Sequence, residues 1–130
     1  MFTLNRIKAT HAKVKSGADF PQYVQDMKAL GVINYTQYVS DGQTVYQGSD
    51  QSITSPAKYG PFTIADNSDI NQLKHHLKIH QAGDTDYLTF CQQVAEDGVE
   101  KWTVDMLALT CTYYDKAGNT MLTEAIPKPK

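Results

Sequence analysis

The chain lacks both a long hydrophobic run and a cysteine framework. A transmembrane helix needs about 20 consecutive apolar residues, and no stretch of this 130-residue sequence approaches that length. The two cysteines, Cys91 and Cys111, form no close pairing motif, which argues against a disulfide scaffold. We therefore expect a cytoplasmic protein with free thiols and no membrane contact.

An excess of charge of either sign is also missing. The sequence has 12 basic and 14 acidic residues, for a net charge of −2. A nucleic-acid surface needs clustered Lys and Arg, so we expect no nucleic-acid partner. Residues 1–17 contain neither an apolar core nor a small-residue cleavage site, which argues against a secretory signal.

What the chain does have is a near-repeat of itself. Residues 4–46 align with residues 70–113 when one residue, Thr85, is inserted in the second copy. The matches fall on apolar positions and glycines, which specify fold rather than activity. The matched pairs include Gly17 and Gly83, Tyr23 and Phe90, Gly31 and Gly98, Tyr35 and Trp102, Thr36 and Thr103, and Tyr46 and Tyr113.

In the first copy, the apolar spacing predicts two helices followed by strands. The first helix is capped by Thr3 and runs to about Ser16, and the second is capped by Asp19 and ends at Gly31. Asp41-Gly42 is a turn signal between strands rich in β-branched and aromatic residues. The expected strands are residues 32–39, 43–47 and 52–55, with one more extended piece at 62–65.

The second copy predicts the same order of elements. Its first helix opens with Asn67 or Ser68 as cap and ends at Gly83, and its second helix begins with Thr85 or Asp86 as cap. The inward stripe of the first of these helices is Ile70, Leu73 and Leu77, and the strands are residues 101–106, 110–115 and 120–126, followed by a mobile tail at 127–130.

This order predicts an α+β fold: an antiparallel sheet with the helices packed on one face. The two similar units, about 1–66 and 67–126, are expected to be related by a pseudo-two-fold. A unit of about 65 residues is too small to cover its own sheet well. We therefore expect one shared core in a single domain, 1–130.

Histidines are the first candidates for chemistry. His76 and His80 are four residues apart on a predicted helix, which places two imidazoles on one face, as a divalent metal requires. Leu77 stands where a zinc protease motif has glutamate, and no third ligand is implied, so we expect no metal. His11 aligns with Leu77, which favours a buried, hydrogen-bonded core histidine.

The thiols and most strand aromatics are interpreted as packing residues. Cys91 lies about two turns into its helix rather than at the N-terminus, where a thiol pKa is lowered. Tyr38 has the opposite strand parity and is expected to be exposed. The aromatics interpreted as core or inter-strand packing are Tyr35, Tyr46, Trp102 and Tyr113.

No catalytic constellation stands out, since the chain has no phosphate-binding glycine loop and no nucleophile elbow. Ile79 faces away from the apolar stripe of its helix and, beside His76 and His80, could mark a contact patch. We expect no cofactor and no catalytic residue. The candidate contact or ligand surface is His76, Ile79, His80, Tyr38 and Tyr59.

Nearly the whole chain resembles the YdfO-like family. The stretches that carry the resemblance are KVKSGADFP, ALGV, SPAKY, DYLTFC, VEKW and TCTYYDKAGN. The family consists of small bacterial proteins of unknown function, many prophage-encoded and some labelled phage envelope proteins. The resemblance implies an α+β domain in a phage or prophage context, with no assigned activity and no catalytic residues to transfer.

Together these observations favour a small cytoplasmic binding module, phage- or prophage-derived, that acts on a protein partner or a small ligand. A duplicated fold can place a groove or a dimer surface on its pseudo-axis, so a homodimer is a further expectation. Two alternatives stay open: an enzyme with a site between the halves, and a minor structural component of the virion. The residues that break the repeat, and would serve the enzyme, are His76, His80, Tyr59, Asp66 and Cys91.

Overall fold

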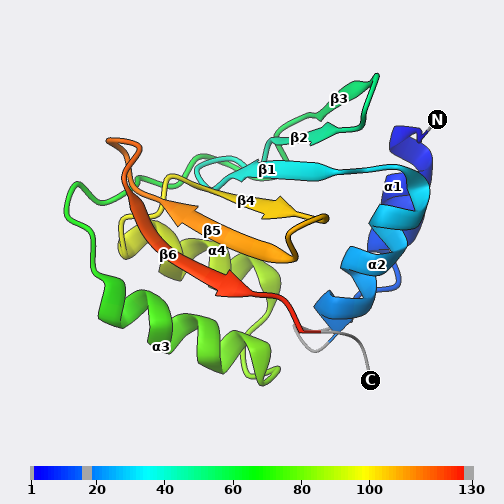
Figure 1. Cartoon of the computed structure of the whole chain (residues 1–130). Coiled ribbons are helices and arrows are strands. Elements are labelled where there is room, and N and C mark those ends of the chain that lie inside the picture. The colour runs from blue at the N-terminus through cyan, green and yellow to red at the C-terminus, as the bar shows by residue number, and fades with distance from the viewer. Residues whose placement is uncertain (1, 16–18, 128–130) are drawn as a thin grey trace.

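The chain folds as two helices and three strands, twice over (Figure 1). The structure is a computed structural model that describes residues 2–15 and 19–127, and the elements below are those of these ranges. Gly17 and residues 128–130 of the predicted tail lie outside these two ranges. The helices are α1 (Leu4–His11), α2 (Phe20–Leu30), α3 (Ile70–Gln81) and α4 (Tyr87–Glu96), and the strands are β1 (Asn34–Tyr38), β2 (Thr44–Gln47), β3 (Ser52–Ser55), β4 (Lys101–Asp105), β5 (Thr110–Tyr114) and β6 (Thr120–Ala125).

The strands form one antiparallel sheet in the order β3-β2-β1-β4-β5-β6. Each unit contributes three neighbouring strands, and β1 and β4 join the units at the centre. Tyr35 pairs with Tyr46 in the first unit, and their repeat equivalents, Trp102 and Tyr113, pair in the second. The two hairpins therefore have the same register, as a duplication requires.

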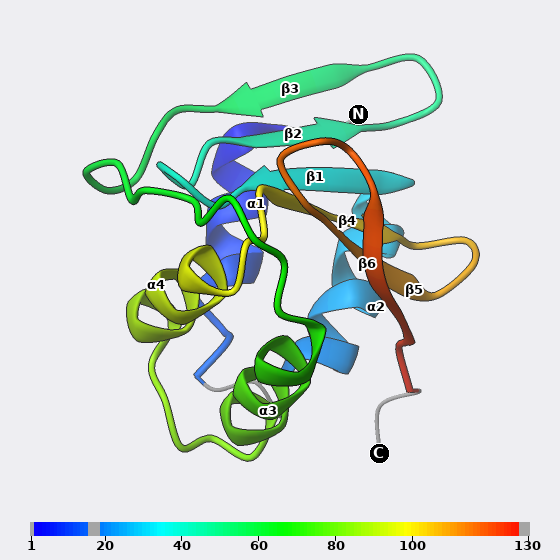
Figure 2. The same ribbon diagram turned by 90° about the vertical axis from the view of Figure 1, so that its left-hand side faces the viewer.

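All four helices cover one face of this sheet, with the pairs α1–α2 and α3–α4 beneath different halves (Figures 1 and 2). Strand burial alternates accordingly: Tyr35 and Gln37 of β1 and Trp102 and Val104 of β4 are buried against the helices. The predicted α+β class, the antiparallel sheet and the one-sided packing of the helices are confirmed. In the part of the chain that the structure describes, no helix lies on the other face of the sheet.

One hydrophobic cluster contains residues of both units. Val24 and Met27 of α2 and Leu73 of α3 are fully buried in it, as is Val94 of α4. Both units therefore contribute to the layer between the helices and the sheet. None of the described helices is long and apolar enough to cross a bilayer.

The first helix is shorter than its sequence pattern predicts. It ends at His11 rather than near Ser16, because the N–H groups of Lys13 and Val14 turn back to the carbonyls three residues earlier. The Asp19 carboxylate then accepts a hydrogen bond from the N–H of Lys15 at 2.8 Å. The Asp19 side chain was expected to cap α2. Because it binds Lys15 instead, α2 begins at Phe20 without a hydrogen bond from a capping side chain.

Three further expectations in the connection to α3 are wrong. The N-cap of α3 is Asp69, whose carboxylate accepts from the N–H of Gln72, rather than Asn67 or Ser68. Ile70 is 41% exposed because it lies at the first position of the helix, short of the core. Residues 62–65 form no strand, since Phe62 N–H and Ala65 N–H donate to the carbonyls of Ser40 and Ala95.

Candidate functional site

A cavity of about 270 Å³ lies between the sheet and the two helix pairs. Side chains from α1, α2, α3 and α4 line it, together with the central strands. Protein interiors are packed nearly as densely as organic crystals and leave few voids larger than a water molecule. A cavity of this size is therefore a feature to explain.

The cavity lies on the pseudo-two-fold axis, because equivalent residues of the two units line it from opposite sides. Offsets of 66 residues before Thr85 and 67 after it relate the lining residues. The equivalent lining pairs are His11 and Leu77, Val14 and His80, Lys15 and Gln81, Phe20 and Tyr87, Tyr23 and Phe90, Tyr35 and Trp102, and Tyr46 and Tyr113. The framework of the cavity is thus symmetric in position.

Its chemistry is not symmetric. In several pairs a polar side chain of one unit corresponds to an apolar side chain of the other, so the two halves of the wall differ in polarity. The pairs of unlike polarity are His11 with Leu77, His80 with Val14, Tyr23 with Phe90, and Tyr87 with Phe20. Gln37 of β1 adds a fifth, since its equivalent is the fully buried Val104.

Gln37 links the two units across the cavity. It is 5% exposed at the centre of the sheet, and its amide Nε2 donates to the hydroxyl of Tyr87 at the start of α4. Burial raises the pKa of Tyr87, so the phenol stays protonated at neutral pH. A buried amide that is hydrogen-bonded in this way is compatible with a stable core and holds Tyr87 at the cavity wall.

His11 is the last residue of α1 and is half-buried at the cavity. Its ring lies 5.5 Å from that of Tyr23 and edge-on to Tyr87 at 6.2 Å between centroids. Burial, and then the charge of Lys58, lowers the pKa of His11, which keeps it neutral. The expected hydrogen bond is absent among the described residues, because the ring opens on the cavity instead of packing into the core.

Lys58 reaches the same cavity from the loop after β3. Its own N–H donates to the carbonyl of Asp41 at 2.7 Å, and the hydroxyl of Tyr59 donates to the carbonyl of Val39 at 2.6 Å. These bonds fix the loop against the β1–β2 turn. Although Lys58 as a residue is exposed, atoms around its ammonium group desolvate it enough to lower its pKa, and the charge of Lys8 adds to this shift.

His80 occupies the α3 side of the cavity. Its Nδ1 lies 3.2 Å from the carbonyl oxygen and 3.1 Å from the hydroxyl of Thr85, the residue inserted in the second copy. Its ring stacks on Phe90 with 4.2 Å between centroids. Burial lowers the pKa of His80. The insertion thus positions a neutral imidazole at the cavity.

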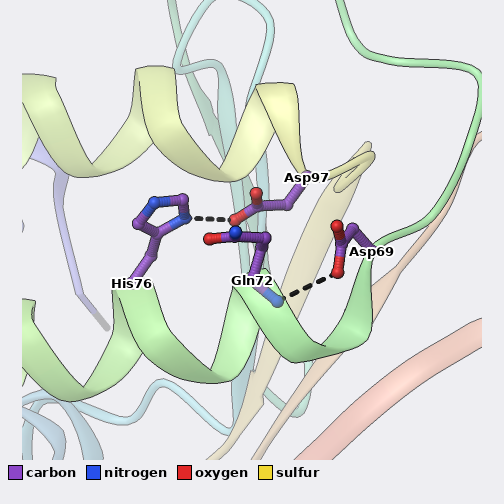
Figure 3. A network of polar contacts seen from close by, with 4 residues as sticks. All are labelled: Asp69, Gln72, His76 and Asp97. Carbon is purple, nitrogen blue, oxygen red and sulfur yellow. Dashed lines mark hydrogen bonds and ion pairs between the residues drawn. The ribbon is translucent and has the colours of Figure 1, made fainter.

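His76 lies elsewhere, in a pair that joins α3 to the end of α4 (Figure 3). Its Nδ1 is 2.5 Å from Oδ2 of Asp97, and the two side chains are 16% and 5% exposed. Burial raises the pKa of Asp97, and the hydrogen bond from His76 opposes that shift. Asp69, in the same view, caps α3 through the N–H of Gln72.

The structure does not bring the five surface candidates together. His80 lines the cavity, His76 is engaged by Asp97, and Ile79 is half-buried on α3. Tyr38 lies on the helix-free face of the sheet, near the ammonium group of Lys101. Tyr59 stacks on Phe62 at 4.9 Å, and Asp66 forms an exposed ion pair with Lys116.

Cys91 and Cys111 are both buried and form no disulfide bond in the described part of the chain, as their interpretation as packing residues predicts. Burial raises the pKa of Cys91, and raises that of Cys111 to about 12. Both therefore stay protonated and weakly reactive at neutral pH. In residues 2–15 and 19–127, no three His, Cys, Asp or Glu side chains form a group that could hold a metal ion.

Sequence reasoning missed Lys58, Gln37 and Val14 as cavity residues. The alignment of the two copies holds a signal for part of this site, because the polar–apolar exchanges His11 with Leu77 and Val14 with His80 both map to the cavity. Lys58 carries no such signal, since it follows the aligned segment.

The comparisons with known proteins give a family and no activity. No curated protein matches the chain. A family model described as "Protein of unknown function (DUF1398)" matches residues 8–125, which include every element from α2 to β6. The chain therefore belongs to the DUF1398 family, whose function is unknown.

Proposed function

We propose that this protein is a small-ligand-binding module whose ligand occupies the cavity on the pseudo-two-fold axis. The observation that carries the proposal is a cavity of about 270 Å³ that both units line with equivalent residues of unlike polarity. Binding sites for small molecules are concave and mostly apolar, with a few placed polar groups. Aromatic rings of both units form a large part of this wall, and Gln37, His11 and His80 supply polar groups.

The size of the cavity sets the size of the ligand. An engineered apolar cavity of about 150 Å³ in another protein holds benzene. A cavity of about 270 Å³ therefore suits a molecule of one or two fused rings. Such a ligand would stack against Tyr23, Phe90 and Trp102, which surround the space from both units.

A matched pair of variants tests the proposal. Val14→Phe fills part of the cavity, whereas Val45→Phe adds the same atoms on the helix-free face, where Val45 pairs with Thr36. A set of one- and two-ring aromatic compounds is screened by thermal shift and calorimetry. We expect compounds that bind the wild type and Val45→Phe and fail to bind Val14→Phe. Binding that is equal in all three proteins, or absent throughout, contradicts the proposal.

The setting of this activity is a second part of the proposal and rests on the YdfO-like resemblance. We propose a cytoplasmic protein of phage or prophage origin that binds its ligand inside the bacterial cell. Mass spectrometry of cell fractions and of purified phage particles tests it. Enrichment in the particles supports the rival role as a virion component, and presence only in the cytoplasmic fraction supports the binding module. The homodimer stays a prediction.

A further inference from the structure

The charged side chains that line the cavity differ in whether another group of the protein already binds them. Its two carboxylates already accept hydrogen bonds: Asp86 from the N–H of Thr89 at 2.8 Å, and Glu124 from the amide of Gln81 at 3.3 Å. The basic groups are different. Among residues 2–15 and 19–127, Lys58 has no ion pair, because His76–Asp97 and Lys116–Asp66 are the pairs that the structure contains there.

Two basic side chains without such a partner among the described residues, Lys58 and His11, line the cavity and lie near each other. Lys58 is close enough to His11 for its charge to lower the pKa of the imidazole, and close enough to Lys8 for the two ammonium groups to disfavour each other. Lys15 also lines the cavity. Both Lys58 and His11 lack a hydrogen-bonded side-chain partner in the described part of the chain. A partly desolvated cation without a partner is unfavourable, and an anion placed beside it relieves that cost.

The loop that carries Lys58 is held in place before any ligand arrives. Two successive N–H groups, of Lys58 and Tyr59, donate to the carbonyl of Asp41 at 2.7 and 3.3 Å. The ring of Tyr59 also packs against Gly42, where a Cβ would lie 2.7 Å from it. Because the backbone is fixed at this position, only the side chain of Lys58 has to be ordered on binding, which lowers the entropic cost.

Aromatic rings of the cavity wall lie next to His11. Tyr23 and Tyr87 flank the His11 ring. Phe90 and Trp102 continue the aromatic wall, with 5.8 Å between their centroids. Planar rings stack well on such surfaces. A ligand that is both planar and anionic can therefore stack on the aromatic rings and place its charge beside the basic side chains.

On the premise that the cavity binds a small ligand, we propose that the ligand is a planar aromatic carboxylate whose anionic group lies between Lys58 and His11. The two oxygens of a carboxylate can accept one hydrogen bond each from the Lys58 ammonium group and from the ring N–H of His11. The engaged carboxylates Asp86 and Glu124 repel the anion from their positions. The ring system then lies toward Phe90 and Trp102.

Two probes of equal shape separate charge from size. The full-length protein is titrated by calorimetry with 2-naphthoate and with the neutral 2-naphthamide. Charged hydrogen bonds contribute roughly 10- to 100-fold to affinity, so we expect 2-naphthoate to bind at least about tenfold more tightly than the amide. Lys58→Met abolishes this preference, whereas Lys58→Arg keeps it. Lys78→Met, on the exposed surface of α3, serves as the matched control and alters neither affinity.

The outcomes distinguish this inference from the function on which it depends. If the amide binds as tightly as the naphthoate, or if Lys58→Met weakens both equally, the carboxylate class is wrong while ligand binding in the cavity stands. If neither probe binds but other aromatic compounds in the screen are excluded by Val14→Phe, the carboxylate class is again wrong and the binding module stands. If no compound is excluded by Val14→Phe, both proposals fail.

Discussion

Thr36 and Thr103, which occupy equivalent positions in the two copies, lie directly opposite each other where the units meet. They pair in the register between β1 and β4, and their Oγ1 atoms are 2.9 Å apart. The pseudo-two-fold axis therefore passes between them, through the centre of the six-stranded sheet. The cavity lies on the other side of the sheet along this axis, where Tyr35 and Trp102 point toward the helices.

This contact gives a first prediction for the junction of the units. Thr36→Val and Thr103→Val each remove a partly buried hydroxyl that bonds the other, at a cost of about 1 kcal/mol. Because the double variant leaves neither hydroxyl unpaired, we expect it to lose less than the sum of the two. Urea unfolding in a double-mutant cycle measures the coupling. The exposed pair Thr112 and Thr123, at 3.3 Å, is the control, and equal coupling in both cycles argues against a specific junction.

A second prediction concerns two equivalent glycines. Gly31 and Gly98 both end a helix with positive φ, at 104° and 94°. A Cβ on Gly31 has its nearest neighbour at 3.9 Å, whereas one on Gly98 would lie 2.7 Å from the carbonyl oxygen of Asn67. Left-handed strain costs about 1–2 kcal/mol for either alanine, and backbone overlap adds about 1–3 kcal/mol at Gly98. We expect Gly98→Ala to be the more destabilising in urea unfolding, and equal losses contradict the close approach.

A third prediction concerns the pair between His76 and Asp97. His76→Phe leaves a buried carboxylate without its partner, and we expect a loss of about 3 kcal/mol in unfolding free energy. Asp97→Leu added to that variant removes the orphaned charge and restores part of the loss. The exposed pair of Lys116 with Asp66 is the control, since Lys116→Met should cause no measurable change. A small effect of His76→Phe would show that the pair does not hold α3 to α4.

A fourth prediction follows from the two cavity histidines. Burial lowers the pKa of His11 and of His80, so below the unfolded value of about 6.5 the unfolded chain binds protons that the folded chain does not. Stability is therefore fully present above that pH and falls as the pH drops below it. The combined variant His11→Leu and His80→Val removes both imidazoles. Each new residue is the one that stands at the equivalent position of the other unit.

We expect this combined variant to show a shallower loss of unfolding free energy than the wild type as the pH falls from about 7.5 toward 5. Urea titrations at several pH values measure the slope. Leu88→Ala, at an exposed position of α4, changes no titratable group and is the control that should keep the wild-type slope. Parallel pH profiles for the wild type and the combined variant would show that neither cavity histidine is held neutral by burial.

Much of the fold follows from the repeat in the sequence, because burial recurs at equivalent positions. The matches of Tyr35 with Trp102 and of Tyr46 with Tyr113 predicted buried strand residues, and all four are buried. The alignment failed at element ends, which local contacts decide. The end of α1 was missed because turns at Lys13 and Val14 close the helix early, and apolar spacing does not encode these bonds.

The candidate site was predictable only in part. His80 was singled out for its spacing from His76, yet the two have different partners, because Asp97 binds one and Thr85 the other. Lys58 lies far in sequence from the helices that it faces, so no local pattern links it to the cavity. Only the assembled fold, in which β3 lies at the edge of the sheet, brings Lys58 and His11 to the same cavity.

The most direct test of the cavity as a binding site uses Trp102, the only tryptophan of the chain and a residue of the cavity wall. Its single indole N–H resonance is followed in a nitrogen-15-labelled sample during titration with the tightest-binding compound of the aromatic screen. We expect a saturable shift of this resonance in the wild type and none in Val14→Phe. Saturable shifts confined to the backbone amides of Thr36 and Thr103, with the Trp102 indole unmoved, would place the ligand on the helix-free face and contradict a binding cavity between the two units.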